Sequence, residues 1–216
     1  MKKVISFSLW GDNPKYTVGA LRNSELSLEI YPDWVCRFYC GKSVPKNIIT
    51  QLKTYKNVEV VEMNEDGDWT GMFWRFYACE DSDVMISRDT DSRLSFREKS
   101  AVDEWLESNK DFHIMRDHPY HTTEILGGMW GCRNGILSNI KNIINEYNKG
   151  NFWQVDQNFL KEKIYPIIKN NSFVHDSFFK VEQDRKNFPS ERVNKEFVGD
   201  VFDENDVRHP EYYKFL

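Results

Sequence analysis

The sequence of 216 residues has only four cysteines, no long apolar run and no excess of positive charge. Cys36 and Cys40 fall within one expected strand, where four residues span roughly 13 Å at ~3.3 Å each, too far for a disulfide. Cys79 and Cys132 stand alone, and no His or Cys partner lies at zinc-ligand spacing. We therefore expect buried free thiols and no disulfide scaffold.

Because the sequence has no long apolar run and no surplus of basic residues, it gives no sign of a membrane span or of a nucleic-acid site. The opening "MKKVISFSLWG" is too short and too rich in serine for a signal peptide or a membrane span, and no other segment is long enough. A formal net charge of -5 gives no reason to expect nucleic-acid binding, because phosphate neutralisation needs a basic surface. We therefore expect a cytoplasmic protein without a nucleic-acid or membrane partner.

Apolar segments of strand length alternate with helical patterns, which predicts a parallel sheet covered by helices on both faces. Strands are expected at 4–9, 34–40, 58–63, 83–87 and 112–116. Helices are expected at 16–30, 45–55, 70–80, 97–108 and 135–147, and from about 153. Beyond Pro166 the pattern is that of loops. The length favours a single domain, with a nucleotide-binding half at about 1–100, an acceptor-side half at about 101–180 and a polar tail at 181–216.

The segment "MISRDTDSRLSFRE" places Asp89 and Asp91 directly after the expected fourth strand. Ligands of open α/β sheets gather beyond the carboxyl ends of the strands, and two carboxylates there suit a divalent cation. The competing interpretation is a solvated turn neutralised by neighbouring arginines, of which we expect Arg93 to have a mixed structural and functional role and Arg97 to lie on the surface. The motif alone does not choose between them.

Two other enzyme classes that act on phosphates or nucleotides have related motifs, and this sequence does not match either of them. A phosphatase that uses Asp-x-Asp as its nucleophile places it after the first strand, whereas this motif lies near residue 90. A P-loop needs a Gly-rich stretch before Gly-Lys-Ser, and "CGKS" at 40–43 has no glycine at the required distance.

Longer stretches around the motif resemble small glycosyltransferases of the GT-A fold, including domains of large algal viruses (chloroviruses) that glycosylate capsid protein. The stretches are "ISFSLWGDNPKYTVGALRN", "FWRFYACEDSDVMISRDTDSRLSFREKSAVDEWLES", "FHIMRDHPYHTTEILGGMWGCR" and "DQNFL". Together they extend over roughly residues 4–180. The resemblance implies a GT-A fold, a Rossmann-like nucleotide-binding half, and transfer of a sugar from a nucleotide donor, most often UDP-linked, to a glycan or glycoprotein hydroxyl.

The resemblance also implies roles for individual residues. Asp89 and Asp91 would hold Mn2+ or Mg2+ against the donor diphosphate, and His175 would be a third metal ligand. A histidine ligand would favour manganese over magnesium. The nucleotide side of the cleft would comprise Ser8, Leu9, Trp10, Lys15, Arg75, Asp89, Thr90 and Asp91, and the sugar would approach Gly127 and Gly128.

Several of these residues also have structural interpretations. Arg75 lies in an otherwise apolar helix, so its charge either reaches solvent or contacts Asp89 or the nucleotide. Inverting transfer needs a carboxylate to accept the proton of the acceptor hydroxyl, for which Asp156 and Asp117 are the candidates. Asp156 also suits a helix cap. The retaining mechanism, a nucleotidyltransferase of similar fold and a catalytically silent sugar-nucleotide-binding module remain alternatives.

Overall fold

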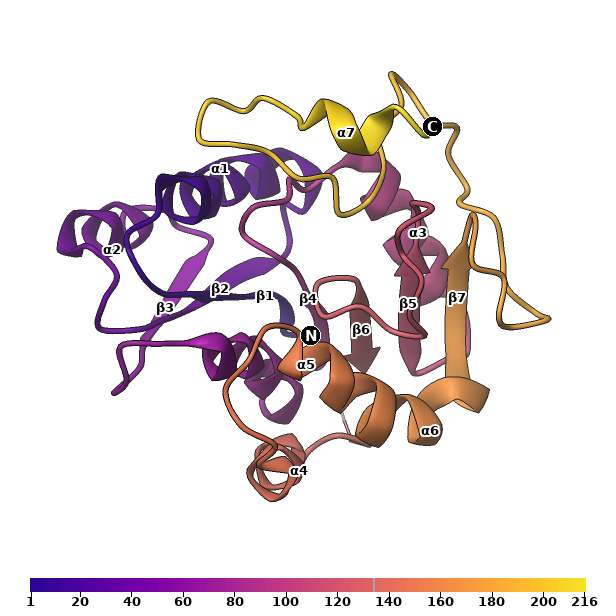
Figure 1. The fold of residues 1–216 in the computed structure, drawn as a ribbon, viewed down its shortest axis with the longest axis horizontal. Coiled ribbons are helices and arrows are strands. Elements are labelled where there is room, and N and C mark those ends of the chain that lie inside the picture. The colour runs from indigo at the N-terminus through magenta and orange to yellow at the C-terminus, as the bar shows by residue number, and fades with distance from the viewer. Residues whose placement is uncertain (134) are drawn as a thin grey trace.

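The protein is described by a computed structural model over residues 1–133 and 135–216, and one sheet of seven strands organises it (Figure 1). The strand order is β3-β2-β1-β4-β6-β5-β7. The strands are β1 Lys3–Leu9, β2 Val35–Cys40, β3 Val58–Glu62, β4 Val84–Ser87, β5 Phe112–Arg116, β6 Trp130–Arg133 and β7 Ser172–Asp176. Because the sheet is continuous, strands from both halves of the sequence share it.

The predicted mostly parallel sheet is confirmed, with two strands that the sequence did not predict. Strands β3, β2, β1 and β4 run parallel, and β5 and β7 are parallel to each other. Strand β6 pairs antiparallel with both β4 and β5. It has four residues, one of them Gly131, so it resembled part of a loop. Strand β7 was also expected to be loop, and that expectation was wrong.

Helices cover both faces of the sheet (Figure 1). One layer contains α1, α2 and α3, with the bounds Pro14–Ile30, Lys46–Leu52 and Phe96–Glu107. The other contains the 3₁₀ helix η1 and the helices α4, α5, η2, α6 and η3, with the bounds Trp69–Glu80, Ile140–Tyr147, Val155–Phe159, Leu160–Ile164, Tyr165–Ile168 and Lys169–Asn171. A short helix, α7 Pro210–Tyr213, lies in the C-terminal segment beside α1.

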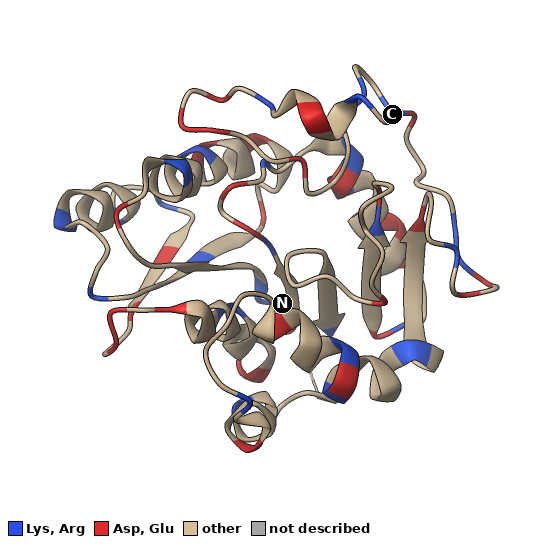
Figure 2. Ribbon diagram, in the orientation of Figure 1, with Lys and Arg blue, Asp and Glu red and all other residues tan. Residues whose placement is uncertain are grey.

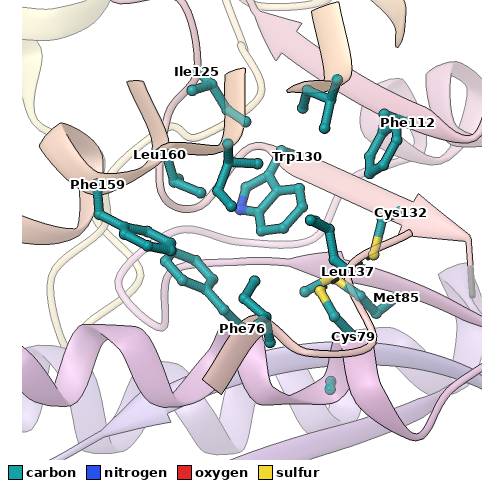
Figure 3. Packing of buried hydrophobic residues seen from close by; sticks show 14 of the residues in the cluster. Phe76, Cys79, Met85, Phe112, Ile125, Trp130, Cys132, Leu137, Phe159 and Leu160 are labelled. Atoms are coloured by element: carbon teal, nitrogen blue, oxygen red, sulfur yellow. Dashed lines mark hydrogen bonds between the residues drawn. The ribbon is translucent and has the colours of Figure 1, made fainter. Parts of the chain in front are cut away.

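Each face of the sheet has its own hydrophobic core because alternate strand residues point to opposite sides. Val4 packs in the core beneath η1 and α4 to η2, whereas its neighbour Ile5 packs in the core beneath α1 to α3. Figure 3 shows the first core, in which the indole of Trp130 lies among residues of η1 and η2. Here Cys79 and Cys132 bring their Sγ atoms to 3.2 Å as free thiols. The expected buried free thiols are confirmed.

The C-terminal segment, expected as a polar tail, packs against the sheet and the Asp-x-Asp loop. Phe188 and Val198 are buried with residues of α3 and β5 in a third small core. Farther on, the amide of Phe202 donates to the carbonyl of Asp91 at 2.8 Å, and the carboxylate of Asp206 pairs with Arg93 at 2.8 Å. The last forty residues therefore help to shape the loop after β4.

In Figure 2, acidic and basic residues are interspersed along most helices and loops, while the segments 59–68 and 200–206 carry acidic residues and no basic one. Within the described residues, no helix has the length and apolar character needed to cross a membrane.

Candidate functional site

A cavity of about 530 Å³ opens beyond the carboxyl ends of β1 and β4. Its size falls in the range of small-molecule and cofactor sites. The wall is formed by β1, α1, η1 and α5, by the loops next to β1, β4, β6, η1 and α5, and by the C-terminal segment. The lining residues are Ser8, Leu9, Trp10, Tyr16, Asp68, Trp69, Met72, Arg75, Asp89, Thr90, Asp91, His121, Leu126, Gly127, Gly128, Met129, Asn151, Trp153, Gln154, Asp156, Gln157, Gly199 and Val201.

The Asp-x-Asp loop is held by close approach of α1. The side-chain amide of Asn23 donates to the carbonyl of Ser92 at 2.9 Å and accepts from the amide of Leu94 at 3.0 Å. A side chain at Gly19 would collide with the carbonyl of Thr90, so glycine lets the helix approach this closely. The loop conformation is thus fixed by a helix about 70 residues earlier in the chain.

Arg75 lies at the centre of the site and joins two carboxylates. Its Nη1 pairs with Asp89, and its Nη2 pairs with Asp156 at 2.7 Å. The guanidinium is almost fully buried. Burial alone would lower the pKa of Arg75, but the charges of Asp89 and Asp156 outweigh it and raise the pKa. Arg75 therefore stays cationic and holds the two carboxylates on neighbouring nitrogens of one group.

Two serines of β1 fix the backbone that carries Arg75. Ser6 Oγ donates to the carbonyl of Arg75 at 2.6 Å, and the amide of Arg75 donates to Ser8 Oγ at 3.0 Å. Helix η1 begins at an N-cap, where Asp68 accepts from the amide of Thr70 at 2.8 Å. The polar residues of an otherwise apolar strand thus position the guanidinium.

Asp91 forms a second ion pair in the cavity, with Lys15 at 2.8 Å. Burial and the nearby charge of Asp89 raise the pKa of Asp91, and the ammonium of Lys15 partly opposes the shift. The pKa of Lys15 is raised because the attraction of Asp91 outweighs the effect of burial. Lys15 is thus the cationic partner of this largely buried carboxylate.

Asp156 has one carboxylate oxygen free of protein partners. Its Oδ2 accepts from Arg75, whereas Oδ1 is buried and meets no hydrogen-bond donor within the described part of the chain. Burial raises the pKa of Asp156, and Arg75 offsets part of this shift. An unpaired oxygen on a buried carboxylate of a cavity-lining residue is unusual in a purely structural role, since buried polar atoms are nearly always paired. The expected alternative of a side-chain cap is not observed for Asp156.

The glycine pair before β6 makes room for these carboxylates. A Cβ on Gly127 would lie 2.5 Å from both Arg75 Nη2 and Asp156 Oδ2. A Cβ on Gly128 would collide with the carboxylate of Asp89. Both glycines therefore lie against the three side chains of the ion-pair cluster, and their approach to a sugar stays a prediction.

Most of the residues expected at the site lie together in the structure. The cavity wall contains Ser8, Leu9, Trp10, Arg75, Asp89, Thr90, Asp91, Gly127, Gly128 and Asp156. Lys15 reaches the cavity through its ion pair with Asp91. The neighbouring arginines do not contact the two aspartate side chains: Arg88 pairs with Glu98 at 2.9 Å and Arg93 with Asp206. Arg97 is buried, so its expected surface position was wrong.

Asp117, the other candidate for the catalytic carboxylate, does not lie at the cavity. Arg97 binds it at 2.7 and 2.9 Å and Arg192 at 2.7 Å, while Ser177 Oγ and the amide of Val198 also donate to it. Both of its oxygens are occupied and the side chain is fully buried. Asp117 therefore joins the C-terminal segment to β5 and α3, and we withdraw it as a catalytic candidate.

His175, the expected third metal ligand, also lies elsewhere. It is buried on β7, where its Nδ1 is 2.8 Å from Nε2 of His113 and its Nε2 is 3.0 Å from Glu104. Both ring nitrogens are therefore engaged, and His175 is not part of the cavity wall. The preference for manganese rested on this histidine and does not hold without it.

The two remaining candidate ligands, Asp89 and Asp91, suit a divalent cation only when other ligands complete its coordination shell. Among residues 1–133 and 135–216, no group of three or more His, Cys, Asp or Glu side chains is arranged to hold a metal ion. Asp89 and Asp91 supply hard oxygen atoms on one wall of the cavity. This donor set suits a cation bound by one or two carboxylates, with phosphate oxygens and water completing the shell, as is usual for Mg2+.

Comparison with solved structures finds proteins of similar fold. A glycosyltransferase involved in the glycosylation of the major capsid of PBCV-1 matches at a TM-score of 0.51 and 18% identity, covering 82% of each chain. The chain has the GT-A fold. The resemblance expected from the sequence is thus confirmed at the level of the fold.

Two further similar structures belong to longer proteins. S. aureus TarS 1-349 matches at a TM-score of 0.47 and 12% identity over 65% of this chain, and the mannosyltransferase PcManGT from Pyrobaculum calidifontis, in complex with GDP-Man and Mn2+, at 0.47 and 9% over 64%. This chain spans 49% and 46% of their lengths. No family model matches the sequence, and no curated protein matches it.

The sequence did not indicate the side chains that complete the cavity wall. Asp68 and Trp69 lie at the start of η1, immediately before Thr70, where the expected helix began. Trp153 and Gln154 precede α5, in a segment that we expected only as the start of a helix. Gly199 lies in the C-terminal segment, for which no motif gave a signal.

The buried His113–His175 pair predicts loss of stability in acid. Burial, followed by the charges of His175 and Arg88, lowers the pKa of His113 well below its usual value, and burial also lowers the pKa of His175. The unfolded chain therefore binds protons that the folded chain does not. Stability is complete above the unfolded pKa and falls as pH drops below about 6.5, by about 1.4 kcal/mol per pH unit for His113.

Urea unfolding between pH 7 and pH 5 measures this slope. His113→Gln removes one of the two groups and should make the slope of unfolding free energy against pH shallower by about 1.4 kcal/mol per unit. An unchanged slope in this variant would contradict the assignment of the acid sensitivity to the pair.

Proposed function

We propose that the chain is a glycosyltransferase that moves a sugar from a nucleotide donor, a UDP-sugar, to a hydroxyl of a glycan or glycoprotein. The observation that carries the proposal is the buried, unpartnered Oδ1 of Asp156, a residue that lines the cavity that holds the Asp89–Asp91 pair. The fold is a second support. The PBCV-1 enzyme is involved in capsid glycosylation, and a viral capsid glycan is accordingly one acceptor that we propose to test.

The charge of the cavity supports a metal-dependent donor site. Four carboxylates line the wall, while Arg75 and the bound Lys15 supply two positive charges. An excess of two negative charges would repel a nucleoside diphosphate unless a cation is present. In the proposal Asp91 and Asp89 hold Mg2+ or Mn2+, which when bound neutralises the charge that develops on the leaving diphosphate. Lys15, released from Asp91, then pairs with a phosphate oxygen.

The proton step falls to Asp156. In the proposal, the acceptor oxygen attacks the anomeric carbon, and the bond from that carbon to the diphosphate oxygen breaks with its electron pair on the diphosphate. The hydroxyl proton passes to Oδ1 of Asp156, while Arg75 holds Oδ2. A raised pKa makes this carboxylate a better base than an exposed aspartate. Single displacement with a protein base inverts the anomeric centre.

Donor binding is the first prediction of this proposal. Calorimetry with UDP should show binding that depends on Mn2+ or Mg2+, and Asp91→Asn should weaken it by about tenfold or more, since one charge-assisted ligand is worth roughly 1.5–3 kcal/mol. Asp83→Asn, which removes an exposed carboxylate at the other end of β4, is the matched control and should bind UDP as the unchanged protein does. Metal-independent binding, or equal binding by Asp91→Asn, would contradict the proposal.

Catalysis gives a second, separate prediction. A thermal-shift screen of sugar nucleotides with metal present identifies the donor, and release of UDP from it is then timed. Asp156→Asn should slow UDP release by about 10²–10⁴-fold, the usual contribution of a general base, while UDP affinity stays within about twofold. Equal rates in the two proteins would refute the role of Asp156. Release of pyrophosphate from a nucleoside triphosphate would instead show a nucleotidyltransferase.

A further inference from the structure

Two exposed tryptophans stand at the cavity without a role in the donor site. Trp153 is 64% exposed and Trp69 is 43% exposed, and both line the cavity. Among the described tryptophans they are the only two classed as exposed, while Trp105 and Trp130 are fully buried. An indole held in water at the wall of a cavity gains nothing for folding, and such surfaces usually bind a partner.

Trp69 and Trp153 lie far apart in the sequence, and the side chain of Asn151 connects the two segments that carry them. Asn151 Oδ1 accepts from the amide of Trp69 at 3.0 Å, and Asn151 Nδ2 donates to Asp68 Oδ2 at 2.7 Å. Because Asp68 also caps η1, Asn151 joins the start of that helix to the loop before α5. The loop that carries Trp153 is therefore fixed relative to Trp69.

The backbone next to Trp153 is strained. Gln154 has a φ of 68°, in the left-handed region that residues other than glycine rarely adopt. Such conformations cost free energy and cluster at ligand sites, where the surrounding structure enforces them. This turn lies between Trp153 and Asp156, so it sets the direction of the indole relative to the free carboxylate oxygen.

The chemistry around the indoles matches a sugar ring. Gln154 and Gln157 also line the cavity here, and each amide offers both donors and an acceptor. A pyranose has an apolar C–H face, which gains from contact with an indole, and hydroxyls at its edge, which need paired donors and acceptors. A purely apolar ligand would leave these amides unpaired. A phosphate would meet no cation of this loop at the cavity wall, because Lys149 does not line the cavity and pairs with Glu162 at 2.7 Å.

We propose that Trp153 and Trp69 form the acceptor subsite, in which an indole stacks on a pyranose ring whose hydroxyl faces Asp156. This inference rests on the proposed function and narrows it. The acceptor is then a carbohydrate, rather than a serine or threonine hydroxyl of a protein. Trp153 is placed on the acceptor side because it lies three residues before Asp156, whereas Asp89 and Asp91 belong to the loop after β4.

The test uses the seven tryptophans as reporters. Indole ¹⁵N–¹H spectra of the full chain are recorded with methyl glycosides of glucose, galactose, mannose, xylose, fucose and N-acetylglucosamine, and separately with UDP and Mg2+ or Mn2+. Trp153→Ala and Trp69→Ala assign the two signals. At least one methyl glycoside should shift both signals in a saturable way, and Trp153→Ala should weaken the binding of that glycoside by about fivefold to tenfold.

A matched control separates stacking from general surface effects. Phe152→Ala removes an aromatic ring that is 39% exposed next to Trp153 but does not line the cavity, and it should leave glycoside affinity unchanged. Trp153→Phe should restore part of the affinity. If no glycoside shifts the two signals, or if Phe152→Ala weakens binding as much as Trp153→Ala, the subsite is refuted.

The glycoside titration and the UDP titration together separate a failure of this inference from a failure of the proposed function. UDP that binds with metal and leaves the Trp153 and Trp69 signals unmoved supports a separate acceptor subsite. UDP that shifts both signals, with no glycoside response, shows that the indoles stack on the nucleobase and overturns the inference while the donor site stands. Glycoside shifts without any UDP binding support the sugar subsite and refute the glycosyltransferase proposal.

Discussion

The buried guanidinium of Arg75 is the interaction on which the site depends. A charge at this depth needs partners, and removing one member of a buried pair typically costs about 3–5 kcal/mol. Arg75 satisfies this need with Asp89 from the loop after β4 and Asp156 from α5. One residue therefore connects three separate elements of the fold, and the position of each carboxylate is set before any ligand arrives.

The rest of the site follows from this constraint. The serines of β1 hold the backbone of Arg75, and the absence of side chains at Gly127 and Gly128 leaves space for the carboxylates. Preorganised charges of this kind act most strongly where water is limited. The same cavity is lined by the Asp-x-Asp loop and by the loop that carries Trp153, and Arg75 pairs with a carboxylate from the first loop and with one from α5.

Local sequence patterns predicted the sheet, the loop after β4 and the charge of the site, because strand and helix periodicity and the end of a strand are local properties. Arg75 could be suspected from its single charge in an apolar helix. The failures share a physical cause. His175, Asp117 and Arg97 are polar residues whose partners lie 20 or more residues away, so the sequence did not show that those partners already satisfy them. Strand β7 and the C-terminal segment likewise depend on tertiary contacts.

The most direct test of the account is a double-mutant cycle on the rate of UDP release from the donor sugar nucleotide, with Arg75→Lys and Asp156→Asn as the single changes. Residues that act as one unit give losses that do not add. The account predicts that the double variant is slower than the slower single variant by no more than about threefold. Losses that multiply across the two changes would show that Arg75 and Asp156 act independently and would contradict the central role of the guanidinium.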